Sequence, residues 1–179
     1  MQTRKALQPY LDELLRTVKA SCDAVTYDKF RTVCAPVRNG KPQRPDISAI
    51  KSLRDDLPDE NLQAHLDVIT NACERTVLDL VALTAVRLLP TVDKLITQSS
   101  TQANLNAVRS RLEVIIVTAQ SAVRRNTVLA YDVTLLHTET TRAMRAGLRL
   151  DAIELKLFET APSHMAKLLN TILPPNQRI

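Results

Sequence analysis

The chain has 179 residues, a formal net charge of +5 at neutral pH and 45% hydrophobic residues. Only two residues are glycine, Gly40 and Gly147, whereas a sheet protein of this length needs more glycine for its tight turns. Three cysteines cannot close a disulfide framework, no apolar run is long enough to span a bilayer, and the polar N-terminal residues show no apolar signal region. These totals favour an all-α protein with an aliphatic core in a reducing compartment, the cytoplasm or the nucleus.

The first helix is predicted from an apolar stripe of leucine and valine. Leu7, Leu11, Leu14 and Val18 are spaced by 4, 3 and 4 residues, which places them on one face of a helix. Pro9 suits only a first turn or a kink, so we expect the firm part of this helix to begin near it.

Residues 24–46 are expected to form a Pro-containing connector, because Pro36, Gly40, Pro42 and Pro45 interrupt any helix. Its apolar residues would anchor it to the core or form a short strand. The segment is basic, with no acid between residues 29 and 44. It is therefore either a solvated connector or a basic arm for phosphates or an acidic partner, and its candidate ligands are Arg38, Lys41 and Arg44.

The middle of the chain predicts a short helix over residues 47–57, with Asp46 as its N-cap, and then a long one. From residue 76 to residue 89 apolar side chains cover nearly the whole circumference, which is typical of a central bundle helix. Pro90 is expected to end that helix, and Thr91 to cap a short one. This break divides the chain into an N-terminal helical subdomain, 1–90, and a C-terminal helical subdomain, 91–179.

The C-terminal part predicts a long helical stretch from about residue 102 to residue 150, with a break near Asn126. Pro162 begins a last helix, and Pro174 and Pro175 stop it. The expected fold is therefore all-α, with six to eight helices in a bundle-like array, arranged as two layers or subdomains, and no sheet.

Catalytic and metal-binding patterns are not found in the sequence. It has no Gly-rich phosphate loop, no His-Glu-x-x-His motif and no nucleophile elbow. Cys22, Cys34, His65 and Cys73 have spacings that match no zinc pattern, and Cys73 is better explained by the apolar stripe around it. We therefore expect no catalytic residue, no metal and no cofactor; an enzyme of an unfamiliar helical family is the remaining possibility.

Arginine forms the most informative pattern. Arg142, Arg145 and Arg149 fall within about 60° of one another around a helix, and Thr138 shares their strip, opposite most of the apolar residues. A planar guanidinium can hold phosphate oxygens in two-pronged fashion.

The preceding helix has a similar face. Arg111 and Arg125 lie on it with Thr118 between them, opposite an apolar stripe. A nucleic acid bound by such faces is held through its phosphates, with little reading of sequence. A row of arginines is equally typical of an ordinary solvated face, and both interpretations stay open here.

Self-association is predicted from residues 112–117, which are apolar on more than one face. Val114 and Ile115 lie away from the stripe of Leu112 and Ile116. One helix buries both faces only if it is central or meets another subunit. We expect Val114, Ile115 or Val117 at a subunit interface or in the centre of the core.

These features together resemble the small all-helical RNA-silencing suppressors of plant closteroviruses, which form basic-lined rings and bind RNA without strong sequence preference. The resemblance lies in the overall build, namely the basic segment from Lys29 to Arg44, the aliphatic helical remainder and the arginine stripe. It implies a homo-oligomeric RNA-binding protein of viral origin in the host cytoplasm. The alternative is a helical-bundle adaptor or viral structural protein with no nucleic-acid role.

Overall fold

The computed structural model describes residues 2–38, 46–98, 102–147 and 160–179, and over these residues the protein is all-α, without a strand. The α-helices are α1 (Gln2–Ser21), α2 (Ala24–Arg38), α3 (Ile47–Lys51), α4 (Glu60–Ile96), α5 (Gln102–Arg125), α6 (Ala130–Gly147) and α8 (Thr160–Leu169). Two short 3-10 turns cover Arg54–Asp56 and Pro175–Gln177. The predicted fold class, an all-α array of six to eight helices, is confirmed.

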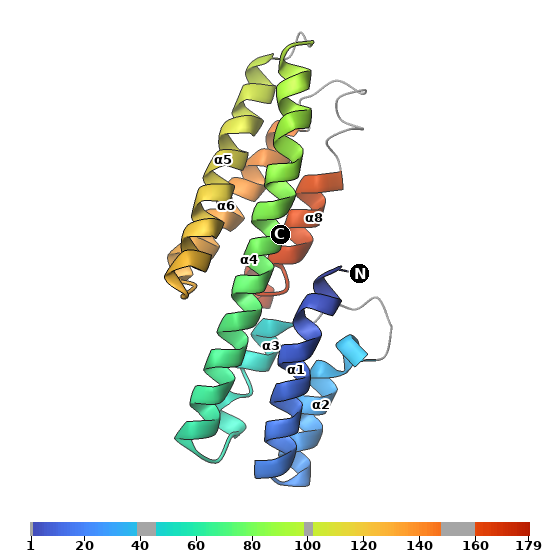
Figure 1. The fold of residues 1–179 in the computed structure, drawn as a ribbon, viewed down its shortest axis with the longest axis vertical. Helices are drawn as coiled ribbons and strands as arrows, with labels where there is room; N and C mark the ends of the chain where they lie inside the picture. Colours follow the sequence, from blue (N-terminus) through green and yellow to red (C-terminus); the bar gives the residue numbers. More distant parts are fainter. Residues whose placement is uncertain (1, 39–45, 99–101, 148–159) are drawn as a thin grey trace.

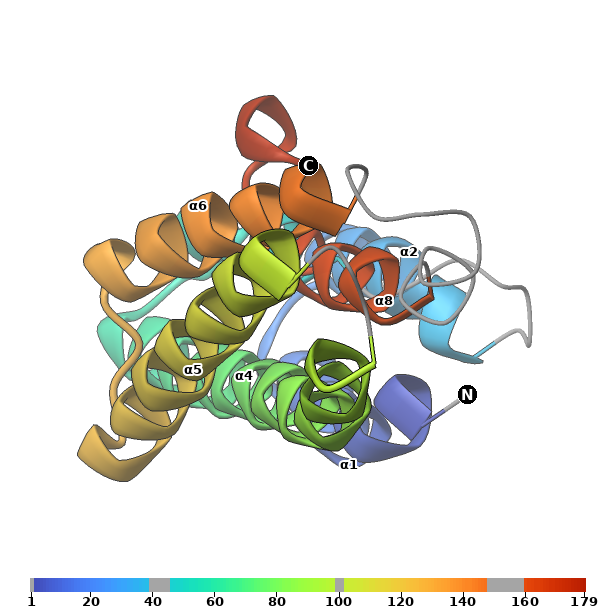
Figure 2. The same ribbon diagram turned by 90° about the horizontal axis from the view of Figure 1, so that it is seen from above.

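Helix α4 is the central element. Helices α1, α3, α5 and α8 pack against it, whereas α2 packs mainly on α1 and α3, and α6 on α5 and α8 (Figures 1 and 2). Helices α1, α2 and α3 gather around its N-terminal half, and α5, α6 and α8 around its C-terminal half. Seen along the long axis, α5 and α1 lie on opposite sides of α4. None of the helices described is long and apolar enough to cross a membrane.

The apolar stripes predicted for α1 and α4 lie in the core. Leu7, Leu11, Leu14 and Val18 of α1 are buried, and so are α4 residues along the whole helix, from Leu66 to Val92. Asp59 caps α4 by accepting a hydrogen bond from the Leu62 amide at 2.9 Å. One continuous aliphatic core therefore extends along both halves of α4.

The connector expected over residues 24–46 is helical over most of its length, as α2, and this part of the prediction is wrong. Phe30 and Cys34, four residues apart, are both buried and fasten α2 to the core. Asp23 begins the helix, because its carboxylate accepts from the Thr26 amide at 2.7 Å, and this bond lowers the pKa of Asp23. Pro36 stands two residues before the helix end, where it removes only one backbone hydrogen bond.

The helix end predicted at Pro90 is also wrong, since α4 continues through it to Ile96. Proline leaves the carbonyl four residues earlier without a donor. That carbonyl belongs to Val86, which lies on the exposed side of α4, so water can satisfy it. Leu88 and Val92 hold both sides of the proline to the core. The proposed boundary between residues 90 and 91 therefore falls inside one helix.

The break predicted near Asn126 is confirmed, because α5 ends at Arg125 and α6 begins at Ala130. Asn126 has a φ of 60°, in the left-handed region that asparagine tolerates better than most residues. Its carbonyl accepts a hydrogen bond from the Asn71 side chain of α4 at 3.0 Å. This turn reverses the chain, so that α6 packs against α5.

Candidate nucleic-acid interface

The junction of α5 and α6 brings together cations that are far apart in the sequence. Leu105, Leu112 and Ile115 of α5 are buried, whereas Arg111 and Arg125 lie at the edge of α5 that faces α6. On α6, Leu136 and Ala143 are buried, whereas Arg142 and Arg145 are exposed. The buried stripes therefore fix the spacing of the two helices. Arg111, Arg125 and Arg142 emerge along their junction, and Arg145 lies one turn beyond Arg142 on the outer face of α6.

A buried carboxylate holds two of these arginines side by side. Glu139 of α6 is only 3% exposed. Its Oε2 accepts from Arg111 Nη1 of α5 at 3.2 Å, and its Oε1 accepts from Arg142 Nη1 at 2.8 Å. Each carboxylate oxygen therefore orients a guanidinium that comes from a different helix.

A second buried carboxylate does the same for Arg125. Asp132 Oδ2 accepts from Arg125 Nη2 at 2.5 Å and from the Leu129 amide at 2.9 Å. The acid thus fastens the start of α6 to the end of α5, and its charge lies near a helix N-terminus, which favours it. Removing the arginine would leave a buried, half-paired carboxylate, which is costly.

The arginines remain open to solvent although they are paired. The side chains of Arg111 and Arg142 are 39% and 56% exposed. A guanidinium has five N–H donors, and each bond to Glu139 uses one of them. The remaining donors are held in place by a carboxylate beneath them, which is a suitable arrangement for receiving a phosphate.

We name this surface the α5–α6 ridge and define it by Arg111, Arg125, Arg142 and Arg145. Its four cations and the two buried acids, Glu139 and Asp132, give it a net charge of +2. Arg111 and Arg125 are 14 residues apart, which corresponds to about 21 Å along α5. The ridge is therefore long enough to contact several phosphates of one nucleic-acid backbone.

Two hydroxyls and one aromatic ring accompany the ridge. Thr118 and Thr138 are half-buried on the same helix faces as the arginines, and small side chains there leave room for a phosphate backbone. Tyr131 is exposed and lies 11 residues before Arg142, which places both on the same side of α6. It provides one surface for stacking at the end of the ridge nearest Arg125.

The candidate ligands predicted from the sequence have different outcomes. Arg142 and Arg145 are exposed on one face of α6, as expected, and Arg111 and Arg125 reach the same junction. Arg149, Lys41 and Arg44 lie outside the described residues. Arg38 is the last residue of α2, and its side chain also lies outside the described part.

Glu139 and Asp132, the acids that position the ridge, are not among the residues predicted from the sequence. A signal for them was present, because Asp132, Leu136, Glu139 and Ala143 are spaced by 4, 3 and 4 residues. This spacing puts two acids in the apolar stripe of α6. An acid in such a stripe needs a cation from a neighbouring helix, and α5 supplies it.

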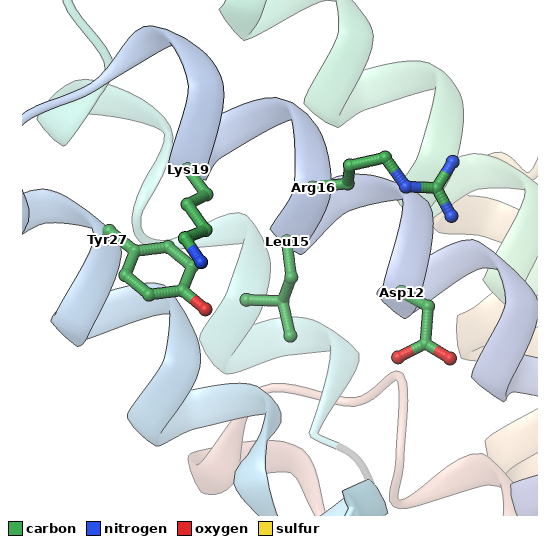
Figure 3. Close-up of a pocket in the computed structure, with 5 residues that line it drawn as sticks. All are labelled: Asp12, Leu15, Arg16, Lys19 and Tyr27. Carbon is green, nitrogen blue, oxygen red and sulfur yellow. The ribbon is translucent and has the colours of Figure 1, made fainter.

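A hollow between α1 and α2 is the second candidate (Figure 3). It has a volume of about 420 Å³ and is lined by Asp12, Leu15, Arg16, Lys19 and Tyr27. The Lys19 ammonium lies 5.8 Å from the centre of the Tyr27 ring and covers one of its faces. Figure 3 shows Arg16 pointing away from Lys19, so the two cations do not converge on one ligand. The ridge has the better-organised donors.

The cysteine and histidine side chains are scattered over the described part of the chain. Among the residues described, no three His, Cys, Asp or Glu side chains gather where an ion could bind. Cys73 is buried, and this burial raises the pKa of its thiol to about 12, with smaller contributions from Cys34 and Glu74. His65 lies by contrast beside Thr17 and Glu13 at the α1–α4 contact.

Comparison with known protein families, with curated proteins and with solved structures returned no match.

Proposed function

We propose that this protein binds RNA through the phosphate backbone, largely without regard to sequence, and that the α5–α6 ridge is the contact surface. The observation that carries the proposal is the pair of arginines on Glu139. Arg111 and Arg142 come from different helices, share one buried carboxylate and still expose their outer donors. The predicted viral suppressor of RNA silencing is one protein of this kind.

The fixed orientation of the arginine side chains supports a phosphate-binding site rather than an ordinary solvated helix face. A free arginine side chain carries about 2 kcal/mol of rotamer entropy, which it loses when it binds a phosphate. The buried carboxylate has already restricted Arg111 and Arg142, so a phosphate orders them at a smaller cost. Arginines without such a support would gain only the screened attraction of separate surface charges.

The chemistry of the ridge favours a duplex over an unstacked single strand. Its donors are guanidinium groups, which contact phosphates and do not by themselves read bases. Tyr131 is the exposed aromatic residue on it, whereas proteins that hold single strands use successive aromatic platforms. We expect the tighter complex with double-stranded RNA and little difference between sequences.

A matched pair of triple variants tests the proposal. Arg111→Gln, Arg142→Gln and Arg145→Gln together remove three charges from the ridge. The control variant carries Arg87→Gln, Lys94→Gln and Lys167→Gln, which removes three exposed charges from α4 and α8. Each protein is titrated into labelled duplex RNA, single-stranded RNA and duplex DNA at two salt concentrations.

The ridge variant should lose affinity for every sequence alike, and its salt dependence should become weaker by about 3 in log–log slope. The control variant should lose far less affinity. Equal losses in both variants would show that only net charge matters and would remove the ridge as a site. If wild type binds no nucleic acid at low salt, the helical adaptor becomes the better account.

A further inference from the structure

Helix α5 carries a second apolar seam, on the side away from the core. Its buried seam is Leu105, Val108, Leu112, Ile115, Ala119 and Ala122, spaced by 3 and 4 residues in alternation. The outer seam has the same repeat and consists of Ala103, Ala107, Ser110, Val114, Val117 and Ser121. An alternating 4-3 repeat of apolar and small residues is typical of a helix that packs against another along its length.

The outer seam is uncovered in the single chain. Val117 is 63% exposed and Val114 is 37% exposed, while Ile115 between them is fully buried. Of the two alternatives predicted for this segment, Ile115 lies in the core, whereas Val114 and Val117 lie on the surface. Small residues at the other seam positions allow a second helix to approach closely.

Helix α4, which packs against α5, also exposes apolar side chains. The ion pair between Asp93 and Arg109, at 2.7 Å, sets the register of the antiparallel helices α4 and α5. Seven residues back from Asp93 is Val86, and seven residues on from Arg109 is Ile116, so Val86 lies level with Ile116. Leu83 and Val86 are each about two-fifths exposed. An exposed patch of this kind marks an interaction surface.

The two edges of the seam differ in chemistry. One edge consists of Arg111, Thr118 and Arg125, which are hydrogen-bond donors at intervals of seven residues. The other edge consists of Asn106, Glu113 and Gln120, which offer carbonyl or carboxylate oxygens at the same interval. The acceptor edge of α5 therefore complements the donor edge of α5 itself.

We infer that a second copy of this chain covers the outer seam of α5, with the two α5 helices parallel and in register. In a parallel pair each acceptor-edge residue faces the donor-edge residue five positions further along the partner, so Glu113 faces Thr118 and Gln120 faces Arg125. An antiparallel pair would instead set each edge against its own kind, arginine column against arginine column. The complementary edges thus select a second copy and its orientation.

This inference stands without RNA binding, because it concerns the seam and its edges alone. Arg111 and Arg125 bond their acids through one nitrogen each, so one further donor of each can face the partner helix while the other donors stay open on the ridge. The dimer would carry one α5–α6 ridge on each side of the seam. Linked ridges would bind a single polyanion more tightly than separate ones.

Sedimentation equilibrium without nucleic acid gives the first test. Wild type should be a dimer at micromolar concentration, and Val117→Glu should weaken dimerisation at least tenfold. The matched control is Val68→Glu, since Val68 is 66% exposed on α4, away from the seam. A monomeric wild type, or a Val117→Glu protein that dimerises as strongly as Val68→Glu, overturns the inference.

Disulfide trapping tests the orientation. In a Cys22→Ser background, Ser110→Cys and Val117→Cys should each form a disulfide-linked dimer under mild oxidation, because equivalent positions meet in a parallel pair. Ala64→Cys, exposed on α4 and off the seam, measures random collision and should react at least tenfold more slowly. Trapping of Val117→Cys at the rate of Ala64→Cys would overturn the parallel register.

Discussion

Replacing Glu139 by glutamine tests whether RNA binding depends on the orientation of Arg111 and Arg142 or only on the positive charge of the ridge. The substitution keeps the size of the side chain and removes the negative charge that holds Arg111 and Arg142. If the ridge attracts RNA only by its charge, the variant gains one net positive charge and binds more tightly. If Glu139 positions the two guanidinium groups, the variant binds less tightly.

The magnitudes favour weaker binding. A negative charge about 6 Å from a bound phosphate opposes it by about 0.7 kcal/mol in water, and salt reduces this further. Without Glu139 the two arginines regain rotamer entropy of up to about 2 kcal/mol each in the unbound protein, and a phosphate must then order them. We expect this ordering to weaken the binding free energy by a total of about 1–2 kcal/mol. The difference of about 0.3–1.3 kcal/mol corresponds to roughly two- to tenfold weaker binding.

The substitution also affects stability, so the assay needs two readings. A hydrogen bond to a charged group contributes about 1.5–3 kcal/mol, and the amide oxygen of glutamine replaces part of it. We therefore expect about 1–3 kcal/mol lower stability by urea unfolding, with the fold intact at room temperature. RNA affinity is measured by titration of labelled duplex at two salt concentrations.

Glu13→Gln is the control, because Glu13 is exposed on α1, outside both the ridge and the outer seam of α5. It makes the same change in net charge and should leave affinity unchanged or slightly increased. If Glu139→Gln tightens RNA binding as much as Glu13→Gln does, Glu139 does not position the arginines and they act as unspecific charges.

Three further predictions concern the fold. Ile115→Asp should unfold the chain or lower its unfolding free energy by more than about 4 kcal/mol, because Ile115 is fully buried. Val117→Asp, two residues along α5, should leave the unfolding free energy of the monomer within about 0.5 kcal/mol. Similar urea midpoints for the two variants would contradict the burial assigned to α5. The pKa of Cys73 is raised from 9.0 to about 12, so its contribution is complete below pH 9 and is lost as the pH rises toward 12. Wild-type stability should therefore fall over that range by up to about 1.4 kcal/mol per pH unit more than the stability of Cys73→Ala, and parallel pH profiles would show that the thiol ionises freely. Pro90→Ala should raise the thermal midpoint, because proline inside a helix costs about 3 kcal/mol relative to alanine, and an unchanged or lower midpoint would mean that the local backbone already compensates for it.

The helices were predictable where apolar spacing is regular, and less so where proline dominated the interpretation. The stripe of Leu7, Leu11 and Leu14 identified α1, and Asn126 marked the turn after α5. Pro36 and Pro90 suggested helix ends because local rules treat proline as a breaker. Burial of Cys34 before Pro36, and of Leu88 and Val92 around Pro90, outweighed the single hydrogen bond that each proline removes, and this burial depends on helices distant in the sequence.

The candidate site was predictable only in part. Helical periodicity places Arg142 and Arg145 on one face, and Arg111 and Arg125 on another, without any structure. Periodicity within one helix cannot show that these faces meet, since their junction depends on how α5 and α6 pack. The role of Glu139 follows only from that packing, because its two partners come from different helices.

The salt dependence of RNA binding by the wild-type chain tests the central claim most directly. Four arginines on the α5–α6 ridge should release about as many counterions for each bound subunit. A plot of log affinity against log salt for duplex RNA should have a slope of about −3 to −4 per subunit, nearly the same for unrelated sequences. Absence of binding at low salt, or an affinity that depends strongly on sequence and little on salt, would contradict the claim.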